Sequence, residues 1–298
     1  MLRIALVGFG NVGKGALDAL MDAPDMTLAC VVEAASVPPA HGLEDKWITD
    51  IADISRFAPI DAAVLALPSR MCPDAASRLL AMGINTVDAF DIHTDIVKTR
   101  KSLDAVAKQH GKAAVLSSGW DPGSDSILRA LFEAMAPRGL SYTDFGPGMS
   151  MGHSVAAKAI DGVENALSMT IPAGSGVHRR MVYVQLKPGA DFARVAADLK
   201  ADAYFAHDDT HVEQVADVSA LLDVGHGVHM TRKGVSGKAH NQQLCFDMRI
   251  NNPALTGQML VASARAVVKR APGCYTLPEI PVIDFLPGDI DELIGRLV

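Results

Sequence analysis

The sequence predicts an α/β protein that consists of a doubly wound parallel sheet and a second, α+β domain. Short apolar runs alternate with helical patterns from residue 2 to residue 122, and a glycine-rich turn follows the first run. Strand-like segments dominate from residue 123 to residue 252. Alternation of strand and helix is typical of right-handed βαβ units and therefore of a parallel sheet. We expect residues 1–122 and 253–298 to form one domain and residues 123–252 to form the other.

The first apolar run, residues 2–7, leads directly into a glycine-rich turn and then into a helical pattern that continues to about residue 21. This order of strand, turn and helix is the one that a Rossmann-type dinucleotide-binding domain requires. Gly8 would allow the tight turn, Gly10 would let the backbone approach a pyrophosphate, and Gly13 would let the helix pack closely on the strand. An ordinary strand–helix turn is the alternative. The predicted cofactor contacts at this turn are Gly8, Phe9, Gly10, Asn11, Val12 and Gly13.

A second apolar run, residues 26–32, ends at Glu33, about 20 residues after the last glycine of the turn. A carboxylate at this place accepts hydrogen bonds from the ribose hydroxyls of adenosine and would repel a 2′-phosphate. The residues that follow, Ala34, Ala35 and Ser36, supply no arginine to hold such a phosphate. We therefore place Glu33 and Ala34 in the cofactor site and expect NAD(H) to be favoured over NADP(H). The alternative is a solvent-exposed glutamate at a strand end.

Further strands are expected at residues 61–67, 85–90 and 113–116, helices at 74–82 and 95–109, and a loop over 38–53. Ligands of such sheets bind beyond the carboxyl ends of the strands. The residues that we expect there along the cofactor are Leu67, Pro68, Ser69, Arg70, Phe90, Asp91, Trp120 and Asp121.

The pattern changes after residue 123. A helix is expected over residues 125–135, and residues 146–153 are too rich in glycine to be a core element, which predicts a loop. Strands at 166–171, 181–186, 210–215, 228–233 and 243–250, with a helix at 192–200, predict an open mixed or antiparallel sheet that forms the substrate wall. A long helix from Pro253 to about residue 270 would return to the first domain, with Pro253 in its first turn.

The composition limits the classes of function. The net charge of −7 provides no basic field for nucleic acid. The first apolar run is broken by glycines and no long apolar stretch follows, so we expect neither a signal peptide nor contact with a membrane, and a cytoplasmic location. The histidine pairs 207/211 and 226/229 have no third ligand at characteristic zinc spacing, which predicts no metal site.

Polar residues stand at several of the predicted loop ends. Asp91 and Asp121 are carboxylates at the carboxyl ends of strands, and carboxylates suit an ammonium group. Side chains that donate hydrogen bonds suit a carboxylate instead. Together the two kinds would complement an amino acid zwitterion, although each residue alone is more often a cap, a turn former or a surface charge. The predicted donors are Thr170, Arg180, His226 and Asn252.

Five segments resemble the meso-diaminopimelate dehydrogenases and occur in the order of that family. They are residues 8–13 (GFGNVG), 87–93 (VDAFDIH), 119–123 (GWDPG), 145–153 (FGPGMSMGH) and 249–253 (RINNP). The shorter chain and residues 178–181 (HRRM) resemble the more compact branch of the family, which accepts a wider range of D-amino acids and 2-keto acids.

The resemblance implies reversible NAD(P)-dependent oxidative deamination at the D-configured carbon of meso-2,6-diaminopimelate, which gives L-2-amino-6-oxopimelate, ammonia and reduced cofactor. It also implies a homodimer that pairs through the second domain. Asp91 and Asp121 would be the catalytic residues that hold the ammonium groups, and Asp91, Asp121 and His153 are all candidates for proton transfer. The implied pocket residues are Trp120, Phe145, Met151 and Gly152, and the implied anchors of the distal L-centre are Thr170, Arg180, His226 and Asn252.

The chain departs from the family at the end of the second strand. The family default is NADP(H), held by an arginine-containing element, whereas this chain has Glu33 and Ala34 there. Three other functions fit the same residues: a reductase of dihydrodipicolinate-like substrates, a broad D-amino acid dehydrogenase or reductive aminase of 2-keto acids, and a non-catalytic NAD-sensing protein.

Overall fold

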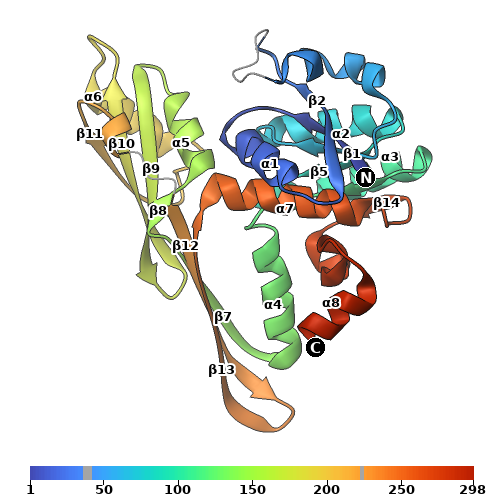
Figure 1. The fold of residues 1–298 in the computed structure, drawn as a ribbon. Helices are drawn as coiled ribbons and strands as arrows, with labels where there is room; N and C mark the ends of the chain where they lie inside the picture. The colour runs from blue at the N-terminus through green and yellow to red at the C-terminus, as the bar shows by residue number, and fades with distance from the viewer. Residues whose placement is uncertain (36–41, 222–224) are drawn as a thin grey trace. The chain divides into compact units, whose positions relative to one another are not determined.

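The computed structural model describes residues 1–35, 42–221 and 225–298. Ser36 and the start of the expected 38–53 loop, up to residue 41, lie outside the described residues. The chain forms two compact units, unit 1 (Met1–Leu131 and Pro253–Val298) and unit 2 (Phe132–Asn252) (Figure 1).

The division falls inside helix α4 (Ser124–Met135) rather than after residue 122, where we expected it. The first turns of α4 belong to unit 1 because the backbone amide of Asp125 donates to the carbonyl of Trp120 at 2.9 Å. The side chain of Asp125 is also fully buried.

Unit 1 contains a seven-stranded parallel sheet with the order β14-β6-β5-β4-β1-β2-β3, which confirms the predicted α/β class. The two outermost strands, β3 and β14, were not predicted. The segment expected to be a loop holds β3 between two short 3-10 helices, Glu44–Lys46 and Ile51–Phe57. The strands are β1 (Leu2–Val7), β2 (Met26–Val32), β3 (Trp47–Ile48), β4 (Ala62–Leu65), β5 (Asn85–Asp88), β6 (Ala113–Val115) and β14 (Gly273–Tyr275).

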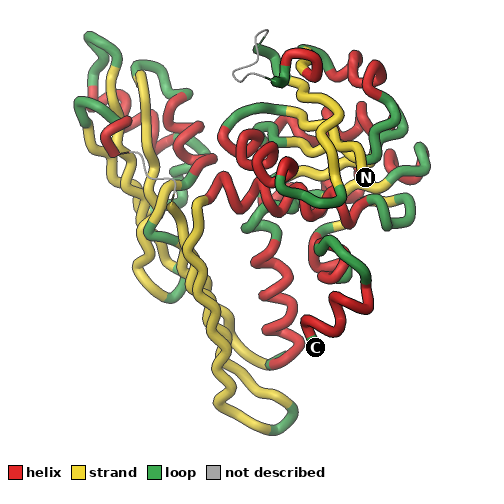
Figure 2. The backbone as a smooth tube through the Cα atoms, in the orientation of Figure 1, coloured by secondary structure: helices red, strands yellow, loops and turns green. Residues whose placement is uncertain are grey.

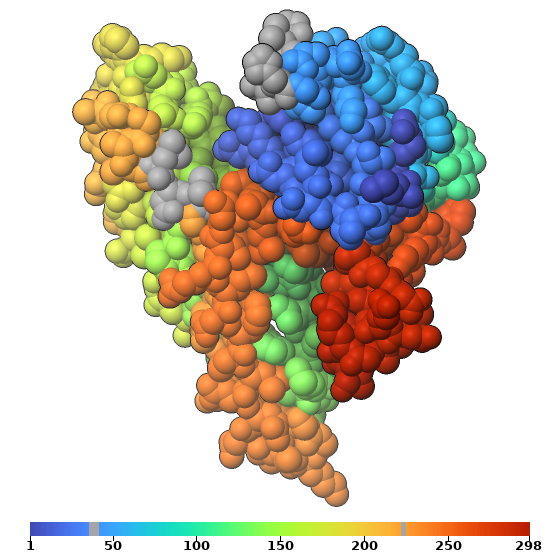
Figure 3. Space-filling view, viewed as in Figure 1, coloured from blue at the N-terminus to red at the C-terminus, as the bar shows by residue number. Residues whose placement is uncertain are grey.

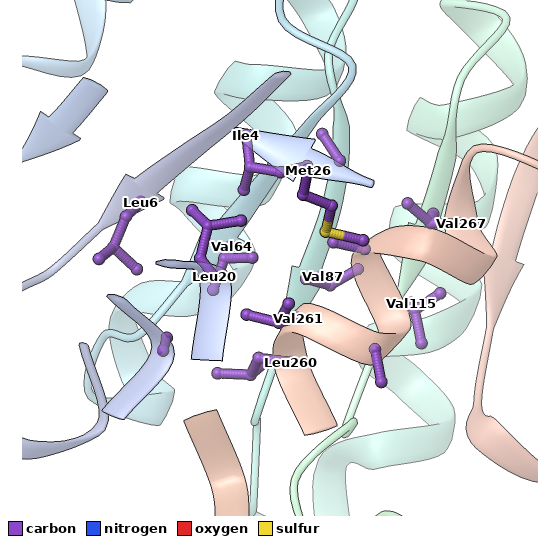
Figure 4. Packing of buried hydrophobic residues seen from close by; sticks show 14 of the residues in the cluster. Ile4, Leu6, Leu20, Met26, Val64, Val87, Val115, Leu260, Val261 and Val267 are labelled. Atoms are coloured by element: carbon purple, nitrogen blue, oxygen red, sulfur yellow. The ribbon is translucent and has the colours of Figure 1, made fainter. Parts of the chain in front are cut away.

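Helices cover both faces of this sheet, which is why its central strands read as continuous apolar runs. Helices α1 (Asn11–Met21) and α7 (Asn252–Val267) share one core with Ile4, Val64 and Val87 of the strands (Figure 4). Helices α2 (Cys72–Ala81) and α3 (Ile96–Gln109) pack on the opposite face. The chain ends in α8 (Ile290–Leu297), red in Figure 3, which buries Leu293 and exposes the terminal Val298. Of the helices in the described ranges, none is long and apolar enough to cross a membrane.

Unit 2 contains two sheets rather than the single open sheet that we expected (Figure 2). The four-stranded sheet is mixed, because β10 pairs with β11 in parallel and with β9 in antiparallel fashion, and the three-stranded sheet is antiparallel. The first sheet has the order β11 (Asp209–Gln214), β10 (Val177–Leu186), β9 (Val163–Gly174) and β8 (Gly148–Met149). The second has the order β13 (Ala239–Asn251), β12 (Gly225–Ser236) and β7 (Arg138–Phe145), and helices α5 (Met151–Lys158) and α6 (Phe192–Ala201) complete the unit.

The predicted loop over residues 146–153 was wrong. Gly148 and Met149 form strand β8, and Met151 begins helix α5. A β-carbon on Gly148 would lie 2.3 Å from the carbonyl oxygen of Gly225. This glycine therefore serves the close approach of two strands, a use that composition alone does not distinguish from a flexible loop.

Candidate functional site

The strand order places a topological switch point at the carboxyl ends of β1 and β4. These two strands are neighbours, β2 and β3 continue the sheet beyond β1, and β5 and β6 continue it beyond β4. The direction of winding thus reverses between them, and open α/β sheets bind ligands at such a point. The glycine turn follows β1, and residues 67–70 follow β4, so both predicted cofactor loops start there.

The glycines of the turn have two different roles. Gly8 has φ +94°, and a β-carbon on it would lie 2.5 Å from the carbonyl oxygen of Ala66. A β-carbon on Gly13 would lie 2.2 Å from the carbonyl oxygen of Gly8. Gly10, in contrast, has open space where a β-carbon would be, and it precedes α1 without any capping side chain. The first-turn amides of α1, from Asn11, Val12 and Gly13, suit an anionic group, and the residues present therefore fit a pyrophosphate.

Glu33 is fixed against the glycine turn. One of its carboxylate oxygens accepts from the backbone amide of Phe9 at 2.7 Å, and the other accepts from that of Ala34 at 2.8 Å. The ring of Phe9 packs edge-on against Trp47 of β3, with 5.3 Å between ring centroids. Glu33 is therefore not a freely solvated glutamate, because its carboxylate joins the end of β2 to the turn after β1.

Asp91 lies beyond the end of β5, and Ser69 of the loop after β4 holds it there. The Ser69 hydroxyl donates to the Asp91 carboxylate at 2.6 Å, and the backbone amide of Asp91 donates back to the Ser69 oxygen at 3.1 Å. Two predicted site residues from neighbouring strands are thereby brought together. Phe90, the next predicted residue, is buried.

Asp121 lies in the turn after β6 and is paired with Arg129 of α4, which donates to its carboxylate. Asp125 stands one helical turn before Arg129, is fully buried, and has no hydrogen-bond partner for either carboxyl oxygen in the described part of the chain. Burial, and next the charge of Asp121, raise the pKa of Asp125 to about 7, against the opposing effect of Arg129. Asp125 was not predicted as a site residue, because an acid in a first helical turn is ordinarily an exposed partner of the helix dipole.

A second buried carboxyl, Asp88, ends strand β5. One of its oxygens accepts from the backbone amides of Phe90 and Ser117 at 2.9 and 3.2 Å, and the other has no partner among the described residues. Burial raises the pKa of Asp88 to about 6, although those two amide hydrogen bonds oppose the shift. Asp88 ties the ends of β5 and β6 together, which are the strands that carry Asp91 and Asp121.

In unit 2, Arg180 and Thr170 are direct cross-strand neighbours on β10 and β9. Both lie within strands rather than at the strand ends where we expected them, because the two strands extend beyond the predicted ranges. Arg180 donates through Nε to Asp208 at 2.6 Å and through Nη1 to the hydroxyl of Thr170. Asp208 was not predicted.

His153 lies in the first turn of α5 beside this pair. Its Nδ1 is 2.8 Å from the Ser150 hydroxyl, and its Nε2 is 3.8 Å from Asp208. Burial, and next the charge of Arg180, lower the pKa of His153 to about 4. His153 is therefore a neutral imidazole at neutral pH.

The other predicted residues of unit 2 lie on separate elements. Phe145 ends β7, and its backbone amide donates to Nε2 of His178 at 2.7 Å. His226 is buried near the start of β12 and accepts at Nδ1 from the amide of Gly227 at 2.8 Å. The remaining positions are Met151 and Gly152 in the first turn of α5 and the buried Asn252 at the start of α7. Across the part of the chain that the structure describes, no three His, Cys, Asp or Glu side chains gather as metal ligands.

The parallel sheet with its glycine turn and the acidic residues at its strand ends are typical of a Rossmann-type oxidoreductase. A family model described as the diaminopimelic acid dehydrogenase C-terminal domain matches residues 119–179. The meso-diaminopimelate D-dehydrogenase of Bacteroides fragilis is 58% identical over 299 aligned residues, which cover 100% of this chain and 99% of the relative. The chain belongs to the meso-diaminopimelate D-dehydrogenase family.

Two solved structures are similar over the full chain. The diaminopimelate dehydrogenase of Corynebacterium glutamicum in complex with diaminopimelate has a TM-score of 0.90 and 27% identity, over 100% of this chain and 99% of the other. An engineered D-amino acid dehydrogenase bound to NADP+ has a TM-score of 0.89 and 26% identity, with the same coverage.

Proposed function

We propose that this protein catalyses the reversible oxidative deamination of meso-2,6-diaminopimelate at its D-centre, with L-2-amino-6-oxopimelate and ammonia as products. The observation that carries the proposal is the similarity over the full chain to meso-diaminopimelate D-dehydrogenase. The chemistry of the site residues is consistent with it, because unit 1 presents carboxylates at its strand ends and unit 2 presents a guanidinium. An amino acid with a second amino-acid centre needs both kinds of partner.

In this proposal Asp91 and Asp121 bind the ammonium groups of the substrate. Asp91 is kept in place by Ser69 and Asp121 by Arg129, so neither carboxylate has to be ordered when substrate binds. The pocket around the reacting centre is assigned to Trp120, Phe145, Met151 and Gly152. The distal, L-configured end is assigned to Thr170, Arg180, His226 and Asn252.

The cofactor site is assigned to the loops at the carboxyl ends of β1, β2 and β4. The amides that begin α1 would hold the pyrophosphate, and Glu33 would accept from the ribose hydroxyls with the lone pairs that Phe9 and Ala34 leave free. When bound, the nicotinamide supplies the hydride acceptor for the substrate α-carbon. Because Glu33 would repel a 2′-phosphate, we propose that NAD(H) is preferred.

The substrate ammonium must lose a proton before its α-carbon can give up a hydride. Asp91, Asp121 and His153 are the candidates to take that proton. The low pKa of His153 leaves its imidazole neutral at neutral pH, so a ring nitrogen is free to accept a proton but holds it only weakly. We prefer the two aspartates because the proposal already places them against the ammonium groups of the substrate.

We also propose that the protein is a cytoplasmic homodimer. Light scattering of the purified protein would test the oligomeric state, and a measured mass of one chain, 31.4 kDa, would contradict the homodimer.

The decisive experiment is an oxidation assay with purified protein, in which meso-diaminopimelate and its L,L-isomer are each supplied with NAD+ or NADP+. Activity on the meso compound alone supports the proposal. Equal activity on simple D-amino acids would favour a broad D-amino acid dehydrogenase. One of the similar solved structures is an engineered D-amino acid dehydrogenase. Cofactor binding without turnover of any of these substrates would favour a sensor.

A further inference from the structure

Arg180 is held from two directions by side chains of its own unit. Its Nε donates to Oδ2 of Asp208 at 2.6 Å, and its Nη1 donates to the Thr170 hydroxyl. The Arg180 side chain is 15% exposed and that of Asp208 is 29% exposed, so the pair is partly withdrawn from solvent. A guanidinium has five N–H groups in one plane. The two contacts use the N–H of Nε and one N–H of Nη1, so one N–H of Nη1 and both of Nη2 remain along the edge that these two nitrogens form.

That remaining edge is suited to bind a carboxylate with two parallel hydrogen bonds. No described residue accepts a hydrogen bond from Nη2. We propose that Asp208 is a positioning residue, which orients Arg180 so that its Nη edge faces the distal carboxylate of the substrate and thereby sets the preference for a substrate with two carboxylates. This inference rests on the proposed function and adds to it a determinant of specificity.

Asp208 is itself held by its surroundings, which is what a positioning role requires. Its backbone amide donates to the carbonyl of Phe205 at 3.1 Å, and Phe205 is fully buried. The ring of His153 packs edge-on against both Tyr204 and Phe205, with Nε2 3.8 Å from the Asp208 carboxylate. The Arg180 guanidinium is thus ordered before ligand binds, which lowers the entropy lost on binding.

Asp208 has two effects on a bound carboxylate, and they have opposite signs. Its negative charge weakens the attraction between Arg180 and the ligand, whereas its hydrogen bond to Nε orients the guanidinium. The variants Asp208→Asn and Asp208→Ala separate these effects. Asparagine keeps an oxygen that can accept from Nε but removes the charge, and alanine removes both.

The experiment compares the two variants with the wild-type enzyme by steady-state oxidation of meso-diaminopimelate. D-lysine, which lacks only the distal carboxylate, is tested as a competitive inhibitor. A matched control is Asp209→Ala, because Asp209 is the next residue and pairs with the exposed Arg179 at 2.8 Å. Thermal unfolding of every variant shows whether the fold is retained.

We expect Asp208→Ala to raise KM for meso-diaminopimelate about tenfold with kcat nearly unchanged, the size of one lost hydrogen bond to a charged group. Asp208→Asn should restore KM to within about twofold of wild type, and the inhibition constant of D-lysine should not change in any variant. A lower KM in both variants would show that only charge matters and would overturn the inference. An equal weakening of D-lysine binding would also overturn it.

A wild-type enzyme without activity on meso-diaminopimelate would overturn the proposed function, and this inference with it. An active wild-type enzyme whose Asp208→Ala variant behaves like Asp209→Ala would overturn this inference alone.

Discussion

The buried carboxyl of Asp125 makes the stability of this protein depend on pH in a direction opposite to that of most aspartates. Its side chain is fully buried and unpartnered in the described structure, and its pKa is raised from 3.8 to about 7. Between these two values the unfolded chain has lost the Asp125 proton and the folded chain still holds it. The free energy of unfolding therefore falls as pH rises through this window, and the full cost is present above pH 7.

The magnitude follows from the size of the pKa change. One pKa unit corresponds to about 1.4 kcal/mol, so the ionised carboxyl costs the folded state at most about 4 kcal/mol above pH 7. Replacement by asparagine keeps the size and the polarity of the protonated carboxyl but cannot ionise. We expect Asp125→Asn to match the wild-type protein at pH 4 and to be more stable than it by up to about 4 kcal/mol at pH 8.

The assay is urea unfolding of the wild-type protein and of Asp125→Asn at several pH values between 4 and 8. The control is Glu133→Gln, an exposed carboxylate on the same helix, which should differ from wild type by less than about 0.5 kcal/mol throughout. A stability difference between Asp125→Asn and wild type that stays constant from pH 4 to pH 8 would refute the reasoning, because it would show that Asp125 does not bind a proton more tightly in the folded state.

Three further predictions concern the site. Glu33→Arg, alone or with Ala34→Arg, should shift the kcat/KM ratio from NAD+ toward NADP+ by at least about tenfold, since a repelling charge becomes an attracting one; a wild-type enzyme that already prefers NADP+ would contradict the premise. Gly13→Ala should destabilise the fold by about 3 kcal/mol, because its β-carbon would lie 2.2 Å from the Gly8 carbonyl oxygen, whereas Gly10→Ala should keep the melting temperature and weaken cofactor binding, as measured by calorimetric titration. Asp121→Asn should lower kcat by about 100-fold or more while the cofactor Kd stays the same, and unchanged kcat would remove Asp121 from the catalytic residues.

Much of unit 1 could be predicted from the sequence, because its signals are local. The apolar runs of β1, β2 and β4 predict strands that are buried on both faces. The spacing of the glycines predicts a turn whose geometry only glycine allows. The position of Glu33 could be predicted because the acidic residue of this fold pattern follows the glycine turn at a fixed distance along the chain. Phe9 and Glu33 are joined by a hydrogen bond across 24 positions, yet a known fold pattern places them together.

The tertiary structure decided the features that depend on register and burial. Whether Arg180 faces Thr170 is set by the pairing of β9 with β10, and whether Asp208 reaches Nε of Arg180 is set by the parallel pairing of β10 with β11. The glycines at 146–153 predicted a loop because glycine composition does not distinguish flexibility from close strand packing. By itself, the sequence determined the five inner strands of the sheet of unit 1, its glycine turn and the acid at the end of β2, since each rests on contacts between neighbours in the chain or on a recurring fold pattern. Only the tertiary structure decided that Asp125 is buried without a partner and that Asp208 holds Arg180, because burial and side-chain pairing arise from segments that are distant in sequence and meet only in the folded chain.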